Sequence, residues 1–213
     1  MAAPDQTGFW NSAAGTKKFT HVLDHARFTR AIARDAFILD FGCGQGRLCA
    51  ELLELGYRNI TGVDSSVEMI RAARQSCPDL DFIVNDDGLL PETRGFDVVL
   101  LFAVLTCIPD DAVQKTLVAG FKRILRPGGL LLISDYPLQT DARNLERYSR
   151  FEHEAGGYGS FRLPDGTLLR HHRREWFDEL LAGFEIEESV ELDAMTMNGN
   201  AARIAQFWCR NSA

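Results

Sequence analysis

This chain has fewer positively charged residues than negatively charged ones. Its 213 residues include 23 Lys and Arg against 30 Asp and Glu, which gives a formal net charge of -7 at pH 7 and a pI near 5.3. Proteins that hold nucleic-acid backbones rely on clustered Lys and Arg. We therefore expect a protein with no nucleic-acid partner.

Long apolar runs and a recognisable targeting signal are also missing. No apolar stretch approaches the roughly 20 residues that a membrane helix needs, and residues 1–18 show no basic start followed by an apolar core. We expect a cytoplasmic protein with no membrane partner, present as a monomer or homodimer.

Cysteine is scarce, and its spacing has no pattern. The five cysteines are an odd number, lie far apart and form no C-x-x-C pair; they are Cys43, Cys49, Cys77, Cys107 and Cys209. This spacing argues against both a disulfide framework and a zinc site. We expect buried, reduced thiols and no metal.

What the sequence does contain is an alternation of strand and helix signals. Short apolar runs occur at 36–41, 59–64, 81–84, 96–104 and 130–134, and helical stripes lie between them at 46–56, 66–76 and 111–125. Ser65, with Glu68 three residues on, predicts a capping box for the second helix. The alternation predicts a doubly wound, mostly parallel sheet with helices on both faces.

The pattern changes after Asp135. Residues 136–172 are polar, rich in arginine and interrupted by glycines, so they predict a small cap made of a short helix and a hairpin-like loop. A helix at 173–184 and two last strands complete a seven-stranded sheet, whose final strand we expect to be antiparallel. We interpret residues 1–213 as one domain: an N-terminal lid or helix (1–35), a core (36–135), the cap (136–172) and a C-terminal part (173–213).

Three glycines follow the first apolar run in "DFGCGQGRL", residues 40–48. A glycine-rich turn at the carboxyl end of a parallel strand lets a ligand approach the backbone closely. Asp64 follows Gly42 by 22 residues, about the offset at which an acid binds ribose hydroxyls. The spacing G-x-G-x-G, preceded by Asp40, differs from the dinucleotide fingerprint and suits a nucleoside that carries a positive charge.

The motif "ILDFGCGQGRL" resembles the first motif of class I S-adenosylmethionine-dependent methyltransferases, which have a Rossmann-like fold. The resemblance continues in register with "GVDSS", "FIVNDDGLLP", "FDVVLLFAVLTCIPDD" and "LRPGGLLLIS", and covers roughly residues 36–135. It implies S-adenosylmethionine as cofactor, with S-adenosylhomocysteine or methylthioadenosine as product.

The resemblance also implies cofactor-binding residues. Asp40 would lie near the amino-acid moiety, Asp64 would bind the ribose, Asp86 and the backbone of Asp87 would face adenine, and the carbonyl of Phe102 would meet the ammonium group. The full predicted set is Trp10, Lys18, Asp40, Gly42, Gly44, Gly46, Asp64, Ser65, Asp86, Asp87 and Phe102. Trp10 and Lys18 belong to an N-terminal segment that either covers the cofactor, with Lys18 or Lys17 at its carboxylate, or is simply a surface helix.

Catalytic candidates come from the cap and from the loop between the last two strands. They are Tyr158, His171, His172 and Asn198. A histidine there could take a proton from a nucleophile, although two adjacent histidines on a loop are also typical of an exposed surface.

Transfer from a sulfonium to a small molecule is the function that these observations favour, since the sequence signatures of base-methylating relatives are missing. One alternative is an azetidine-2-carboxylate synthase, a cyclase that uses the cofactor's own amine and releases methylthioadenosine. A catalytically silent cofactor-binding module is the third possibility.

Overall fold

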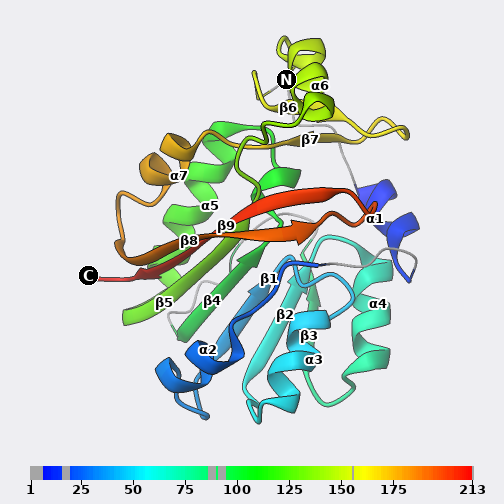
Figure 1. The fold of residues 1–213 in the computed structure, drawn as a ribbon. Coiled ribbons are helices and arrows are strands. Elements are labelled where there is room, and N and C mark those ends of the chain that lie inside the picture. The colour runs from blue at the N-terminus through cyan, green and yellow to red at the C-terminus, as the bar shows by residue number, and fades with distance from the viewer. Residues whose placement is uncertain (1–6, 16–19, 86–89, 91–94, 155, 213) are drawn as a thin grey trace.

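A computed structural model describes residues 7–15, 20–85, 90, 95–154 and 156–212. Its centre is a seven-stranded sheet in the order β3-β2-β1-β4-β5-β9-β8 (Figure 1). The strands are β1 (Ile38–Phe41), β2 (Ile60–Asp64), β3 (Asp81–Val84), β4 (Phe96–Phe102), β5 (Leu125–Asp135), β8 (Glu185–Met195) and β9 (Ala201–Arg210). β9 is antiparallel to both of its neighbours, and the other pairs are parallel. The predicted fold class is confirmed.

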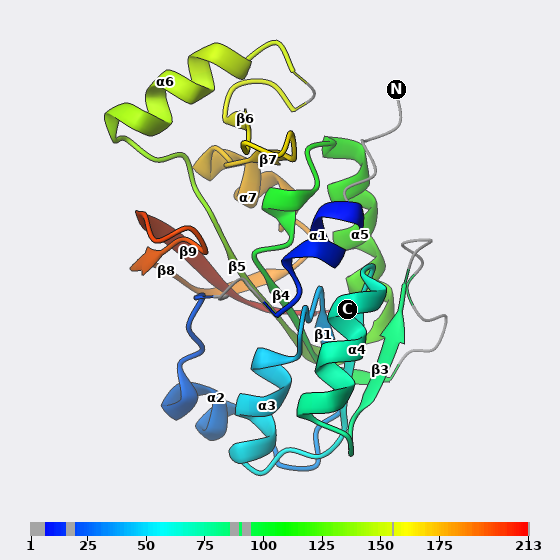
Figure 2. The ribbon, with the colours of Figure 1, turned by 90° about the vertical axis from the view of Figure 1, so that its right-hand side faces the viewer.

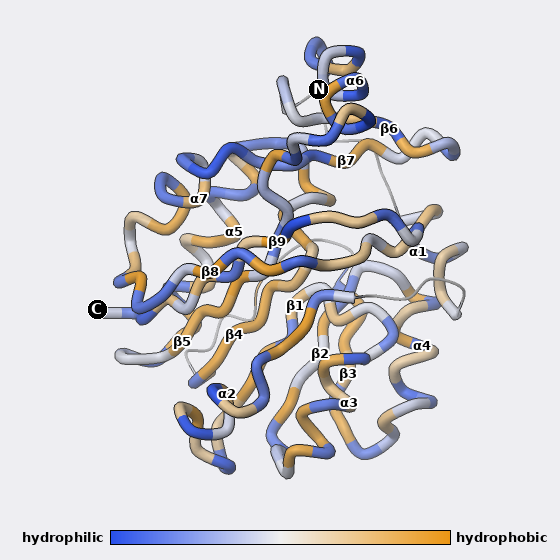
Figure 3. Tube along the Cα trace, viewed as in Figure 1, coloured by the Kyte–Doolittle hydropathy of each residue, from blue (hydrophilic) through white to orange (hydrophobic). Residues whose placement is uncertain are grey.

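Helices cover both faces of this sheet. They are α2 (His25–Ala31), α3 (Arg47–Glu54) and α4 (Val67–Ser76) on one face, and α5 (Asp111–Ile124) and α7 (Arg174–Leu180) on the other (Figure 2). Neighbouring residues of β1 show why both layers form: Ile38 packs under α3 and Leu39 packs toward α5, and both side chains are fully buried. A strand that is buried on both faces consists mainly of consecutive apolar residues, and Figure 3 shows such apolar stretches along β4 and β5.

Side-chain caps begin α2, α4 and α5, whereas α3 begins after Gly46 without one. Ser66, rather than the predicted Ser65, caps α4: its Oγ accepts a hydrogen bond from the backbone N–H of Met69 at 3.1 Å. The Ser66 hydroxyl also donates to Asn11 Oδ1 at 2.6 Å and so holds α1 (Thr7–Ala13) beside the start of α4. The N-cap residue expected for α4 was wrong by one position, because Asp64 and Ser65 complete the turn before the helix begins.

The predicted cap is a helix followed by a hairpin. α6 (Ala142–Phe151) precedes β6 (Ser160–Arg162) and β7 (Leu168–Arg170), which pair antiparallel in a sheet of their own. Backbone hydrogen bonds from His172 N to Tyr136 O, at 3.0 Å, and from Leu138 N to His172 O, at 2.8 Å, join the end of the hairpin to the chain leaving β5. The cap therefore stands over the carboxyl ends of the strands (Figure 1).

Candidate functional site

A cavity of about 510 Å³ opens where β1, β2, β4 and β5 end. Strand order reverses between β1 and β4, and ligands bind at such a switch point in open parallel sheets. Among the residues predicted from the sequence, the cavity lining includes Trp10, Asp40, Gly42, Gly44, Asp64, Ser65, Phe102, His171 and Asn198. Side chains that are remote in sequence thus meet at one edge of the sheet.

The turn after β1 requires glycine for two reasons. Gly42 has a φ of +75°, and a Cβ at that position would lie 2.3 Å from Val104 Cγ2. Gly46, at φ +81°, packs against α4, where a Cβ would lie 3.1 Å from Ala73 Cβ. A side chain at either position would be strained, and one at Gly42 would also press on Val104, which lines the cavity. The turn therefore presents bare backbone to a ligand.

Asp64 is held by the backbone at the mouth of the cavity. Its Oδ2 accepts the N–H of Gly44 and its Oδ1 accepts the N–H of Ser66, both at 2.9 Å. Burial raises the pKa of Asp64, and these N–H groups act in the opposite direction. A carboxylate oriented in this way keeps lone pairs for further donors, such as the two hydroxyls of a ribose.

Asp40 lies beneath the same turn and is 2% exposed. Burial raises its pKa to about 7, while the Cys49 thiol, which donates to Oδ2 at 3.3 Å, acts in the opposite direction. A cation placed nearby would favour the charged form of this carboxyl group. The turn, Asp40 and Asp64 together fit a nucleoside that carries an amino group.

His171 contributes an imidazole at the cap end of the cavity. Its Nδ1 lies 2.6 Å from the Tyr148 hydroxyl, and its ring stacks on Tyr136 with 5.0 Å between the centroids. Burial, followed by the charge of Arg147, lowers the pKa of His171 well below its ordinary value. The ring is therefore neutral near pH 7 and is held in one orientation.

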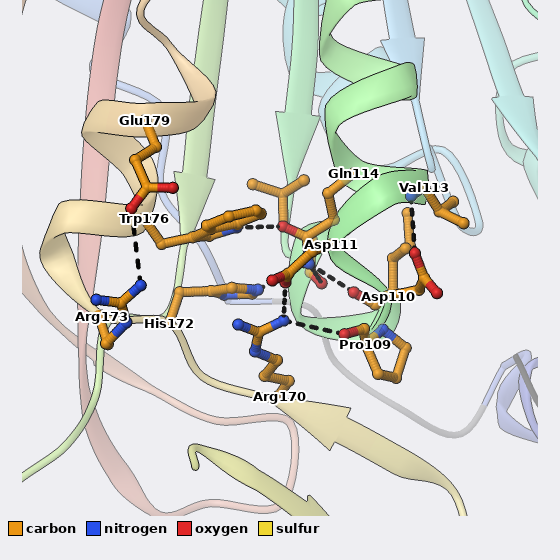
Figure 4. Close-up of polar contacts among 12 residues, drawn as sticks. Pro109, Asp110, Asp111, Val113, Gln114, Arg170, His172, Arg173, Trp176 and Glu179 are labelled. Carbon is orange, nitrogen blue, oxygen red and sulfur yellow. Dashed lines mark hydrogen bonds and ion pairs between the residues drawn. The ribbon is translucent and has the colours of Figure 1, made fainter. Parts of the chain in front are cut away.

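His172 points away from this cavity, although it is the next residue. Its Nε2 lies 2.8 Å from Gln114 Nε2, and Gln114 Oε1 accepts the Trp176 indole N–H at 2.7 Å (Figure 4). Arg170 donates to the carbonyl of Pro109 at 3.0 Å and pairs with Asp111 in the same group. His172 thus joins the hairpin to α5.

Tyr158 is 45% exposed and packs edge-on against Tyr148. Neither Tyr158 nor His172 is among the described residues that line the cavity, so we leave both out of the catalytic residues proposed below. Lys17, Lys18, Asp86 and Asp87 lie outside the described residues, and their predicted roles remain predictions.

Several residues that line the cavity were not singled out from the sequence, and two of them are charged residues of the cap. Arg143 and Arg147, on α6, face the cavity, whereas the sequence analysis treated the cap only as rich in arginine. Their spacing of four residues places them on one face of a helix and was the available signal.

Some features are absent from the described part of the chain. No group of three or more His, Cys, Asp or Glu side chains there is arranged to hold a metal ion. None of the helices described combines the length and apolar character needed to cross a membrane. All five cysteines are described, and all are free.

Comparison with known proteins gives consistent results. Residues 38–129 match the methyltransferase domain family. Trans-aconitate 2-methyltransferase from Azoarcus sp. (strain BH72) is 38% identical over 149 residues, which are 69% of this chain and 56% of that protein. Ubiquinone biosynthesis O-methyltransferase from Xanthomonas oryzae pv. oryzae is 31% identical over 135 residues, 59% of this chain and 55% of that protein. The chain thus spans little more than half the length of these relatives.

A solved structure shares the fold. The SAM-dependent methyltransferase structure from Methanosarcina mazei superposes with a TM-score of 0.81 at 24% identity, covering 89% of this chain and 97% of that one. The glycine turn, the carboxylate that ends β2 and these similarities lead to one conclusion: the chain belongs to the class I S-adenosylmethionine-dependent methyltransferase family.

Proposed function

We propose that this chain transfers the methyl group of S-adenosylmethionine to a small molecule bound under the cap. The observation that carries the proposal is the Asp64 carboxylate, which Gly44 and Ser66 orient toward a cavity that continues from the glycine turn to the cap. The relatives named for trans-aconitate methylation and for ubiquinone biosynthesis support a small-molecule acceptor.

When bound, the cofactor supplies a methyl group on a positively charged sulfur, which is already an activated leaving group. Asp64 binds the ribose hydroxyls, Asp40 lies toward the amino group, and the carbonyl of Phe102 accepts from that group. Trp10, on α1, lines the cavity and excludes water from it. We retain Ser65, Gly42 and Gly44 as cofactor contacts. Gly46, which packs against α4 and is not among the described lining residues, shapes the turn. Lys18, Asp86 and Asp87 are further candidates.

His171 and Asn198 are the acceptor-side residues of this proposal. The Tyr148 hydroxyl engages Nδ1 of His171, so Nε2 is left to contact an acceptor. Since its lowered pKa makes the imidazole a weak base, we assign His171 to positioning the acceptor by a hydrogen bond. Methyl transfer depends chiefly on in-line positioning and exclusion of water, so such a role is sufficient.

The test is to incubate the protein with S-adenosylmethionine, alone and with a small-molecule extract, and to identify nucleoside products by mass spectrometry. S-adenosylhomocysteine that forms only with extract supports the proposal. Methylthioadenosine without an acceptor would instead indicate the intramolecular cyclase, which no comparison favours. Tight cofactor binding with neither product would overturn both and leave a silent binding module.

A further inference from the structure

We propose that Arg143 and Arg147 bind a carboxylate group of the acceptor, so that the substrates of this site are small carboxylic acids. This inference rests on the proposed function, because it concerns the half of the cavity that the cofactor residues leave for the acceptor. It adds a substrate class that the cofactor motifs do not specify, argued from the side chains at the cap end of the cavity.

Placement is the first argument. The two arginines are one helical turn apart on α6 and line the same cavity as His171. The Arg147 guanidinium carbon lies 3.3 Å from the centroid of the Phe161 ring. Stacking on an aromatic face orients a guanidinium and leaves its N–H edge free to engage a planar oxyanion.

Missing counter-charge is the second argument. The Nε of Arg147 is buried and has no hydrogen-bond partner among the described residues, and no ion pair of Arg147 is found among them. Burial lowers the pKa of Arg147 to about 10 and the charge of Arg143 acts in the same direction, whereas Tyr148, which hydrogen-bonds to the Arg147 side chain, opposes them. Among the described residues, the ion pair of Arg143 is a loose one, 3.8 Å from Asp141, and its side chain is 42% exposed. Two neighbouring guanidinium groups, one of them buried at Nε and without an ion pair among those residues, favour an anion between them.

The distribution of charge along the cavity is the third argument. Asp40 and Asp64 are the lining acids among the described residues, and both lie at the glycine turn. Arg47, also in the lining, is already paired with Glu51 at 2.6 Å. The turn end is therefore acidic and suits the cationic cofactor, whereas the cap end is basic and repels a second cation.

Carboxylate fits this end better than phosphate. Arg147 lies over Phe161, which packs in one apolar cluster with Leu163 and Leu169, and all three of these residues line the cavity. Phosphate sites typically add backbone N–H groups from a helix start or a glycine loop, and the glycine loop of this cavity lies at the opposite, acidic end. An apolar wall with a guanidinium pair is suited to an organic acid with a hydrocarbon body.

The experiment is isothermal titration calorimetry on protein saturated with S-adenosylhomocysteine. The probes are citrate, succinate and benzoate, their neutral amides, and inorganic phosphate. We expect at least one carboxylate to bind, its amide to bind far more weakly, and Arg147→Gln to weaken the carboxylate by about tenfold or more, the effect of losing one charge-assisted hydrogen bond. Arg143→Gln combined with Arg147→Gln should abolish binding.

Arg150→Gln is the matched control, because Arg150 lies on α6 but is not among the described lining residues; it should leave carboxylate affinity unchanged. The affinity for S-adenosylhomocysteine should stay the same in every variant, which shows that the site is intact. The inference is wrong if no carboxylate binds the loaded protein, if phosphate alone binds, or if the double variant binds as the wild type does. Failure of S-adenosylhomocysteine to bind at all would instead overturn the proposed function.

Discussion

Replacing Asp64 by asparagine should separate its structural role from its role in binding. Both carboxylate oxygens accept backbone N–H groups, from Gly44 and Ser66. An amide keeps one acceptor but turns a donor toward the other N–H, so Asp64→Asn should lower the free energy of unfolding by about 1–3 kcal/mol. The variant should therefore fold, with a lower melting temperature.

The effect on binding should be larger. Two hydrogen bonds from ribose hydroxyls to a carboxylate contribute about 1.5–3 kcal/mol each, and the amide retains a weaker version of one. We expect a loss of about 2–4 kcal/mol, or roughly 30- to 700-fold in affinity for S-adenosylhomocysteine. Calorimetric titration of the folded variant measures this loss.

Asp81→Asn provides the control for this experiment. Asp81 is an exposed acid at the start of β3, at the opposite end of that strand from the cavity. It should change neither the melting temperature nor the affinity appreciably. If the Asp64→Asn variant binds S-adenosylhomocysteine as tightly as the wild type, the assignment of Asp64 to the ribose is refuted.

Three further predictions concern the turn and the cap. Because the pKa of Asp40 is raised to about 7, binding the ammonium group of S-adenosylhomocysteine near Asp40 at pH 7 should release a proton from this carboxyl group. Calorimetry in buffers of different ionisation enthalpy should detect the proton in the wild type but not in Asp40→Asn, and equal proton release by the two proteins would contradict the placement of the ammonium group beside Asp40. Gly42→Ala should lower the free energy of unfolding in denaturant titrations, because the added methyl group would collide with Val104; adding Val104→Ala should restore this free energy except for about 1–2 kcal/mol, the strain of a left-handed backbone conformation at alanine. A double variant no more stable than the single one would exclude that collision as the cause. Burial lowers the pKa of His172 to about 3, so the contribution of its neutral ring to the free energy of unfolding is complete above its ordinary pKa of 6.5 and is lost as pH falls toward 3. From pH 7 to pH 4 the free energy of unfolding should therefore fall more in the wild type than in His172→Gln, and equal falls would show that His172 does not titrate in this way.

Much of the fold could be predicted because its signals are local. Apolar runs such as 96–104 indicate strands buried on both faces, and β4 forms there as Phe96–Phe102. The glycine turn could be predicted equally well, since a positive φ combined with close packing strongly favours glycine. The predicted N-cap of α4 was off by one residue, because which serine caps this helix depends on how the preceding turn closes on Asp64.

The acceptor side could not be predicted in the same way. Adjacent residues of an extended segment point to opposite sides, so one of His171 and His172 faces the cavity and the other faces Gln114. Which one does so depends on how the hairpin docks beside Tyr136.

The sequence by itself determined the alternating strands and helices, the glycine turn and the acid that ends the second strand, because each depends on residues close together in the chain. The tertiary structure alone decided that His171 and the arginine pair of α6 share a cavity with that turn. Their meeting depends on the register of β6 with β7 and on the packing of α6 against that hairpin. These are contacts between distant segments, for which local residue patterns carry no signal.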